Sequence, residues 1–251
     1  MKITIVGAGN IGTQFAVHCA YKGHQVIMFG SKPHLVQNRL AIVNHDGIEL
    51  FSGEIYKSTS EPKEAFEDTE LIFVTVPAFC MESIAKEILP FIKADVKICL
   101  VPGNGGGEWA FKACIERGAI VFGMQRVPSV ARLVEYGKSV CATGYRDCLY
   151  VAAIPCDYGT ECADIIENIF DIRCETFADY LNLTLIPSNP ILHTTRLYNL
   201  FRDYDLNTVY ESIPLFYEDW TDETSELIFL CDDEVQKICK RLSSFDLSSL
   251  V

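Results

Sequence analysis

The chain has 251 residues, 49% of them hydrophobic, and a formal net charge of −13. This length allows one large or two modest domains, and the apolar content is enough for a substantial core. A surface this negative repels phosphate backbones and anionic lipid, which argues against nucleic-acid and membrane partners.

The sequence also predicts a cytoplasmic protein. It has no run near the roughly 18 consecutive apolar residues of a membrane-spanning helix, and its N-terminal apolar run is too short for a signal peptide. None of its eleven cysteines has the C-x-x-C spacing of a zinc or redox site. We therefore expect no metal site and reduced, mostly buried thiols.

The first thirty residues have the pattern of a dinucleotide-binding unit. An apolar strand leads into Gly7–Gly12, which fits G-x-G-x-x-G; a helix follows from Thr13, and a second strand spans 25–29. The first glycine makes the tight turn, the second lets the backbone approach a pyrophosphate, and the third lets helix and strand pack closely. This context favours a nucleotide site over a purely structural glycine turn. The predicted cofactor-binding residues of the turn are Gly7, Ala8, Gly9, Asn10, Ile11 and Gly12.

The end of the second strand indicates which nucleotide binds. An NAD site carries an acidic residue about 20 residues after the glycines, where it binds the ribose 2′-hydroxyl. Gly30 takes that place here, and Ser31 and Lys32 follow. A hydroxyl and a cation suit a 2′-phosphate, so we predict NADP, with NAD as the alternative in which Lys32 is only a solvated lysine.

The remainder of the first domain predicts alternating strands and helices. In chain order we expect a helix near Pro33–Val43, a hairpin over 47–58 centred on Ser52 and Gly53, a strand over 70–77, a helix over Met81–Phe91, a strand, glycine-rich loop and helix over 95–114, a strand over 119–128 and a pair of hairpin strands over 138–155. Such alternation is typical of a Rossmann-type, doubly wound parallel sheet.

Ligands of such sheets bind outside the carboxyl ends of the strands. Val76 and Pro77 lie at that edge, so we assign them to the cofactor. The loop after the next strand brings backbone amides close to a ligand, and arginines pair with carboxylates. The predicted substrate-binding residues are Asn104, Gly105, Gly106, Arg126 and Arg132. The competing interpretations are a flexible glycine connection and surface arginines.

From Pro190 the pattern becomes helical and strands become scarce. We expect a nucleotide-binding domain over 1–185 and a smaller, all-α substrate and catalytic domain over 186–251. Ser188 or Asn189 suits the N-cap and Pro190 the first helical position. This puts His193 in the first turn, where the helix dipole disfavours the imidazolium. A neutral histidine suits a general base; the alternative is a residue packed at a helix end.

Several of these segments together resemble the octopine/nopaline (opine) dehydrogenase family. They are "GAGNIG", "VPGNGGG", the region "RVPSVARLVEYGKSV", "NPILHT" and "YEDWTDETSELIFLCDDEVQKIC". In that family an α-keto acid condenses with an amino acid, and NAD(P)H reduces the resulting imine to a secondary amine. The resemblance implies that His193, in Asn-Pro-x-x-His, is the catalytic histidine and that keto acid and amino acid meet between the two domains.

The chain also departs from that family. Members are considerably longer, and they pair the histidine with an acid later in the second domain. No position here matches that acid, although Asp203, Asp205, Asp219 and Asp222 are nearby. We expect either a truncated form or an acid supplied elsewhere. A short second domain leaves an apolar face exposed, which favours a homodimer.

Two related families share the first domain: ketopantoate reductases and glycerol-3-phosphate dehydrogenases. Both resemblances require a lysine in the second half to polarise the substrate carbonyl. The chain has no lysine between Lys138 and Lys237, which argues against both and leaves His193 as the acid–base group. A third alternative is a module that binds NADP without turnover.

Overall fold

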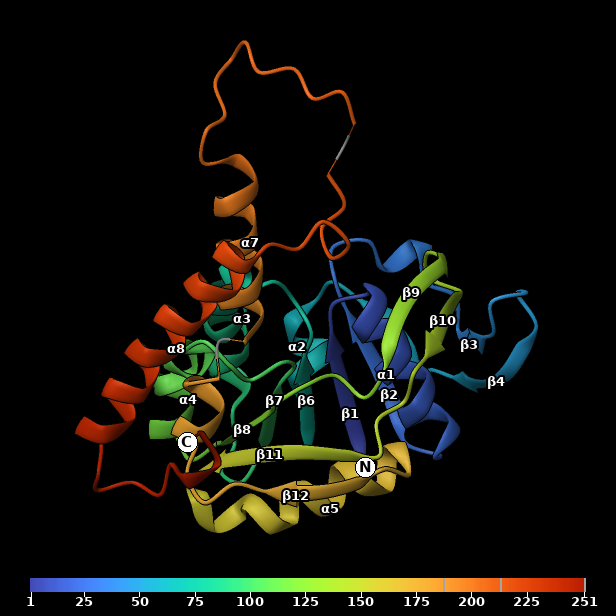
Figure 1. Ribbon diagram of the computed structural model, residues 1–251. Coiled ribbons are helices and arrows are strands. Elements are labelled where there is room, and N and C mark those ends of the chain that lie inside the picture. Colours follow the sequence, from blue (N-terminus) through green and yellow to red (C-terminus); the bar gives the residue numbers. More distant parts are fainter. Residues whose placement is uncertain (187, 213, 251) are drawn as a thin grey trace. The chain divides into compact units, whose positions relative to one another are not determined.

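The structure is a computed structural model that describes residues 1–186, 188–212 and 214–250. The chain divides into a first unit, Met1–Thr184, and a second unit, Leu185–Val251. The first unit is α/β with a mostly parallel sheet and the second is helical (Figure 1). The predicted fold class is therefore confirmed.

An eight-stranded sheet forms the middle of the first unit, in the order β12-β11-β8-β7-β6-β1-β2-β5. Every neighbouring pair from β8 to β5 is parallel, β11 pairs antiparallel with β8, and β12 runs parallel to β11. The strands are β1 Lys2–Val6, β2 Gln25–Phe29, β5 Lys57–Thr59, β6 Leu71–Val74, β7 Lys97–Leu100, β8 Ile120–Met124, β11 Cys148–Ile154 and β12 Arg173–Thr176.

Helices cover both faces of this sheet, because successive side chains of a strand point to opposite faces. On β1, Ile3 and Ile5 pack in one apolar cluster with Phe15, whereas Val6 packs in another with Phe66. The first cluster includes α1 (Asn10–Tyr21) and α5 (Gly159–Phe170); the second includes α2 (Pro62–Phe66), α3 (Met81–Ile88) and α4 (Lys112–Glu116). Both faces are buried, so the strands are continuous apolar runs.

A second, four-stranded sheet packs on the outer side of α1. Its order is β4-β3-β10-β9, and its strands are β3 Arg39–Val43, β4 Glu49–Glu54, β9 Val130–Glu135 and β10 Ser139–Thr143. Leu40 and Val140 join the same apolar cluster as Phe15 of α1. At Gly53 a Cβ atom would lie 2.6 Å from that of Ala20, so β4 packs directly on the helix. Helix α1 is therefore buried between two sheets.

Three of the expected elements were wrong, all because this second sheet was not foreseen. The segment predicted as a helix over Pro33–Val43 forms a short 3₁₀ turn, Pro33–Leu35, and then strand β3. Ser52 and Gly53 lie inside β4, which pairs with β3, rather than at a hairpin turn. The strands over 138–155 are β10 and β11, which belong to different sheets.

The second unit is described here by itself. It contains α7 (Ser188–Phe201), α8 (Asp222–Arg241) and a 3₁₀ turn, Ser248–Leu250. The Thr221 hydroxyl accepts a hydrogen bond from the Thr224 backbone N–H at 3.3 Å and so caps α8. Two acids in the first turn of α8 and two cations in its last turn match the helix dipole.

Two further findings concern the whole described chain. Among its helices, none has both the length and the apolar character needed to cross a membrane. The eleven cysteines are free thiols, of which five are buried, five are half-buried and Cys156 is exposed. Fewer thiols are buried than the composition suggested.

Candidate functional site

The glycine turn between β1 and α1 is shaped by contacts that exclude side chains. Gly7 has φ +103° and its N–H donates to the Phe29 carbonyl at 2.9 Å. A Cβ atom on Gly12 would lie 1.9 Å from the Gly7 carbonyl oxygen, which is impossible without moving the backbone. A Cβ atom on Gly9 would meet nothing within 4 Å. The turn is therefore tight at Gly7 and Gly12 and open at Gly9.

The open side of this turn suits an anion. Gly9 is the N-cap of α1 and provides no side-chain acceptor for the first helical N–H groups. Those groups and the positive end of the helix dipole attract phosphate. The side chain of Asn10 points elsewhere, since its Oδ1 accepts a hydrogen bond from the Leu133 N–H at 2.7 Å. The residues present thus fit a dinucleotide pyrophosphate.

Two adjoining hollows lie at the carboxyl ends of the parallel strands, and Val76 lines both. We call the two together the nucleotide groove. The larger, of about 610 Å³, is lined by Gly9, Asn10, Ile11, Thr75, Val76, Pro77, Ala78, Met81, Val101, Pro102, Asn104, Val127, Ser129, Val130, Ala131 and Arg132. The smaller, of about 410 Å³, is lined by Val6, Gly7, Ala8, Phe29, Gly30, Ser31, Ser60, Val76, Cys80, Ser83, Ile84, Glu87 and Tyr136.

The groove brings together most of the predicted residues of the first unit. Those that line it are Gly7, Ala8, Gly9, Asn10, Ile11, Ser31, Val76, Pro77, Asn104 and Arg132. Five predicted residues are not among its described lining: Gly12, Lys32, Gly105, Gly106 and Arg126. Gly12 lies behind the turn, where it permits close packing, and Lys32 is exposed one residue beyond Ser31.

The loop after β7 forms one wall of the larger hollow through Asn104. Gly103 is held against the sheet, because its N–H donates to the Met124 carbonyl at 2.8 Å. Gly105 and Gly106 have φ values of +74° and +81°, and the Gly105 N–H donates to the Thr184 carbonyl at 3.4 Å. The glycines of this loop therefore let the chain turn sharply beside the groove.

The second sheet also contributes residues to the groove, and the sequence did not predict this. Ser129, Val130 and Ala131 line the larger hollow, and Tyr136 lines the smaller one. All lie in or next to β9. The segment over 130–135, VARLVE, has two valines, which are common in strands, but no alternation of apolar and polar residues, so its period did not indicate a strand and we interpreted it only as a source of Arg132.

His193 lies in the second unit, as the sixth residue of α7. Its Nε2 is 3.4 Å from the Tyr217 hydroxyl, and its ring meets that of Phe216 edge-on at 5.3 Å between centroids. The helix begins at Ser188, so Pro190 is not the first helical position and His193 is not in the first turn. The predicted effect of the helix dipole on His193 is therefore wrong, because the dipole's influence falls off after one turn. The capping role predicted for the Ser188 side chain lies outside the described residues.

Arg196, one turn after His193, fixes the segment that carries Tyr217. Its side chain is fully buried, its Nε donates to the Phe216 carbonyl at 2.8 Å, and its Nη2 donates to the carbonyls of Leu215 and Asp219. The guanidinium carbon also lies 5.6 Å from the centroid of the Trp220 ring. These contacts order the hydrogen-bond partner of His193.

The nearby acids make other contacts. Asp219 accepts from the Leu215 N–H at 2.6 Å, and Asp205 accepts from the Asn207 N–H at 2.6 Å. Asp203 pairs with Arg202, and Asp222 begins α8. Within the described part of the chain, none of these carboxylates forms an ion pair with His193.

Comparisons with known proteins divide the chain in a similar way. Residues 3–135 match the family profile "Ketopantoate reductase PanE/ApbA", and residues 176–251 match "NAD/NADP octopine/nopaline dehydrogenase, alpha-helical domain". The two matches fall mainly on the groove-bearing unit and on the unit with His193, respectively.

Individual relatives are distant. The chain is 27% identical to the uncharacterized protein y4xO of Sinorhizobium fredii, over all of this chain and 71% of that protein. It is 25% identical to the octopine dehydrogenase of Mizuhopecten yessoensis, over 72% of this chain and 46% of that enzyme. The chain thus matches about half the length of that octopine dehydrogenase.

A solved structure has the same fold. The structure described as octopine dehydrogenase with NADH and L-arginine superposes with a TM-score of 0.86 at 19% identity, over 100% of this chain and 67% of that chain. At this identity the likeness concerns the fold alone.

Proposed function

The chain belongs to the octopine/nopaline dehydrogenase family, with an N-terminal domain of the PanE/ApbA ketopantoate reductase type, and from this we propose that it joins an α-keto acid to an amino acid by NADPH-dependent reductive condensation. One observation carries the proposal: a groove built on the glycine turn and a helical unit of octopine type with a half-buried histidine occur in one chain. The product is a secondary amine formed through an imine.

The first unit holds the nucleotide in this proposal. The Gly7–Gly12 turn and the start of α1 take the pyrophosphate, Ser31 and Lys32 the 2′-phosphate, and Val76 and Pro77 contact the nucleotide further along the groove. NADPH bound there supplies the hydride. At the end of β2, Gly30 stands where an NAD site has an acidic residue, so no carboxylate at that position repels a 2′-phosphate, which supports NADP over NAD.

The substrates are held by cations and backbone amides. Both substrates carry a carboxylate, and guanidinium groups bind carboxylates through paired hydrogen bonds. We assign this role to Arg126 and Arg132, of which Arg132 lines the larger hollow. We also assign Asn104, Gly105 and Gly106 of the adjacent loop to the substrates; the Gly105 N–H already donates to the Thr184 carbonyl, and Asn104 lines the larger hollow.

His193 is the acid–base group of the proposal. An amino acid attacks a keto carbon only after its ammonium group has lost a proton, and imidazole accepts such a proton near neutral pH. After the attack, one proton moves from the nitrogen to the former carbonyl oxygen and the same ring returns a second, so the oxygen leaves as water and a protonated imine forms. Tyr217, 3.4 Å from Nε2, orients the ring.

Replacing His193 tests this assignment. We expect His193→Ala to lower turnover by ~10²-fold or more while the affinity for NADPH is unchanged. His34→Ala, which removes an exposed histidine after β2, is the matched control. Steady-state kinetics with NADPH titrations separate the two effects. Unchanged turnover in His193→Ala would remove this residue from the mechanism.

The PanE/ApbA match favours a second candidate, simple reduction of a keto acid. The absence of lysine between Lys138 and Lys237 argues against it, because ketopantoate reductases require a lysine in the second half. An assay without amino acid distinguishes the two, because only simple reduction proceeds in that case. A cytoplasmic location, inferred from the cysteine usage, and a homodimer, inferred from an exposed apolar face of the second domain, complete the proposal.

A further inference from the structure

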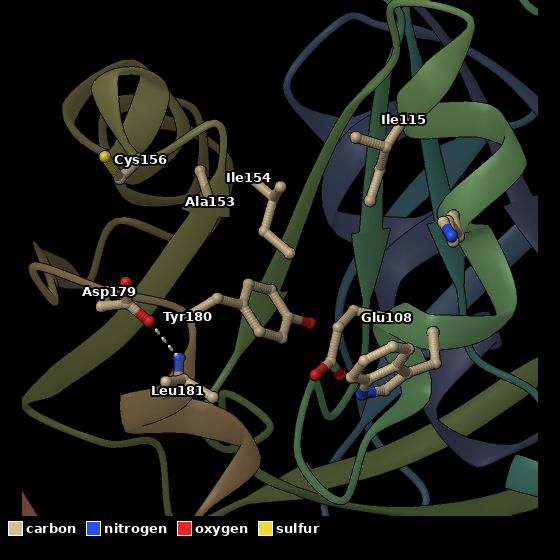
Figure 2. Close-up of a pocket in the computed structure, with 10 residues that line it drawn as sticks. Glu108, Ile115, Ala153, Ile154, Cys156, Asp179, Tyr180 and Leu181 are labelled. Atoms are coloured by element: carbon tan, nitrogen blue, oxygen red, sulfur yellow. Dashed lines mark hydrogen bonds between the residues drawn. The ribbon is translucent and has the colours of Figure 1, made fainter. Parts of the chain in front are cut away.

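A third hollow lies in the first unit, away from the nucleotide groove. It has a volume of about 460 Å³, within the range of small-molecule sites. It shares no lining residue with either part of the groove. Its walls are mainly apolar, and Figure 2 shows them contributed by Ile115 on one side and by Ala153, Ile154 and Leu181 on the other.

Glu108 supplies a buried carboxylate to this hollow. Its side chain belongs to the 3₁₀ turn Gly107–Phe111, and the residue is only 8% exposed. One oxygen, Oε1, accepts a hydrogen bond from the Thr184 hydroxyl. The other, Oε2, is buried without a hydrogen-bond partner among the described residues. A carboxylate oxygen left in this state is costly, so the site favours a donor that can reach it.

Tyr180 supplies a second polar group next to Glu108. It points across the hollow toward Glu108 (Figure 2), is 5% exposed, and its hydroxyl also has no partner in the described chain. Burial raises the pKa of the Tyr180 phenol well above its usual range, and Glu108 adds to the effect. The phenol is therefore neutral near pH 7 and can accept a hydrogen bond.

The position of Tyr180 is fixed by two glycines and its own backbone. A Cβ atom on Gly103 or Gly123 would lie 2.9 or 2.5 Å from the phenol oxygen, so only glycine leaves room for it. The Tyr180 carbonyl accepts from the N–H groups of Leu183 and Thr184 at 2.9 and 3.1 Å. The unpartnered Tyr180 oxygen is thus held in place by the fold.

We propose that this hollow binds a small molecule with a primary ammonium group on an apolar body. The ammonium donates to Glu108 Oε2 and the Tyr180 hydroxyl, and the body packs against Ile115, Ile154 and Leu181. Both oxygens are buried from water, so binding requires the Glu108 carboxylate to rotate toward the hollow. The hollow is also lined by Lys112, whose side chain is largely exposed and pairs with Glu116, and by Asp179, so its buried charge is that of Glu108. A carboxylate at the buried end would meet that charge, and a neutral apolar ligand would leave both oxygens unpartnered.

Benzylamine is a suitable probe, because it is protonated at neutral pH and carries an apolar ring. Calorimetric titration of the full chain compares it with benzyl alcohol, which has the same ring and no charge. Each titration is repeated with saturating NADPH, which separates this hollow from the groove. We expect one benzylamine per chain, bound at least ten times more tightly than benzyl alcohol, and unaffected by NADPH.

Glu108→Gln is the decisive variant, because it keeps the shape and the Thr184 contact but removes the charge. It should abolish the preference for the amine, and Tyr180→Phe should weaken amine binding less. Glu54→Gln, at an exposed acid on β4, is the matched control and should bind like the parent.

Should Glu108→Gln fail to fold, Ile154→Trp carries the test, since a large ring fills the apolar side and should abolish amine binding. Equal binding of amine and alcohol, undiminished amine binding in Glu108→Gln or Ile154→Trp, displacement of the amine by NADPH, or no amine binding at all would each overturn the proposal. The outcome is independent of the reductive condensation proposed above, because neither benzylamine binding nor these variants involve the groove.

Discussion

At the scale of single residues, the proposed preference for NADP depends on two side chains after β2. Ser31 lines the smaller hollow of the groove, whereas Lys32 is exposed beside it. A lysine at the rim reaches a phosphate through its flexible stem without lining the cavity itself. This geometry is compatible with the NADP assignment and makes Lys32 the residue that tests it.

We expect Lys32→Ala to weaken NADPH binding about tenfold, because one charge-assisted contact is lost, and to leave NADH binding unchanged. Titrations of NADPH and NADH into the same variant give the ratio of the two dissociation constants directly. Lys63→Ala, at an exposed lysine of α2, is the control and should alter neither affinity. Equal losses for NADPH and NADH would refute a 2′-phosphate contact at Lys32.

A second residue, His18, couples stability to pH. It is buried on α1 and its Nε2 lies 3.0 Å from the Tyr145 hydroxyl. Burial lowers the pKa of His18 from 6.5 to about 4, while Asp171 opposes this shift and Lys22 adds to it. The folded state therefore prefers the neutral ring, and the unfolded state binds the extra proton between pH 6.5 and 4. The contribution of His18 to the free energy of unfolding is therefore largest above pH 6.5. It decreases by up to about 3 kcal/mol as the pH drops to 4.

Replacing this ring should therefore reduce the sensitivity of the protein to acid. We expect His18→Gln to lose less Tm between pH 7 and pH 4.5 than the parent chain, whatever its Tm at pH 7. Thermal unfolding followed by circular dichroism at several pH values is the measurement. His45→Gln, at an exposed histidine between β3 and β4, controls for removal of an imidazole. If Tm fell equally with pH in His18→Gln and in the parent, His18 would not be the group that couples stability to pH.

At the scale of elements, the packing of β4 on α1 determines how the first unit is layered. The backbone of Gly53 lies so close that a Cβ atom would be 2.6 Å from Ala20 Cβ, 2.8 Å from Tyr21 N and 2.9 Å from Val17 O. Two of these neighbours are backbone atoms of a helix, which cannot give way easily.

Gly53→Ala should for this reason destabilise the protein by about 1–3 kcal/mol through overpacking. Urea unfolding gives the free energy of unfolding for each variant. Glu54→Ala changes the next, exposed residue of the same strand and should cost much less. A Gly53→Ala variant as stable as the parent would show that β4 can move away from α1 without loss of stability.

The same elements show how far the sequence could predict the structure. The β1–α1–β2 unit was correct, because its glycines and its change of period are local signals. The second sheet was missed, since β3 and β10 are adjacent in space but about a hundred residues apart in the chain. Apolar residues such as Leu40 and Ile42 predict burial, and only the tertiary partner decides between helix and strand.

The candidate site was predictable to a similar extent. Positions near a recognisable turn or strand end, such as Gly9, Val76 and Asn104, line the groove. Tyr136 and Ser129 were missed, because they reach the groove from the second sheet. The start of α7 was misplaced by two residues, since Pro190 suits the first turn as well as its first position.

At the scale of the whole molecule, the proposal divides the work between the two units. The first has the features of a nucleotide site, with open backbone at Gly9 and a helix N-terminus beside it. The second holds His193 in contact with Tyr217, on a segment ordered by Arg196. Family membership agrees with this division, because the PanE/ApbA profile matches the first unit and the octopine-type helical profile the second.

The central claim is that one chain carries out reductive condensation, and the most direct test is the oxidation of NADPH by the purified protein. The assay follows NADPH absorbance with pyruvate or another small keto acid, with and without a panel of amino acids. We predict oxidation only when both a keto acid and an amino acid are present, together with formation of a secondary amine. Oxidation with keto acid alone, or tight NADPH binding without oxidation under any combination, would contradict the account.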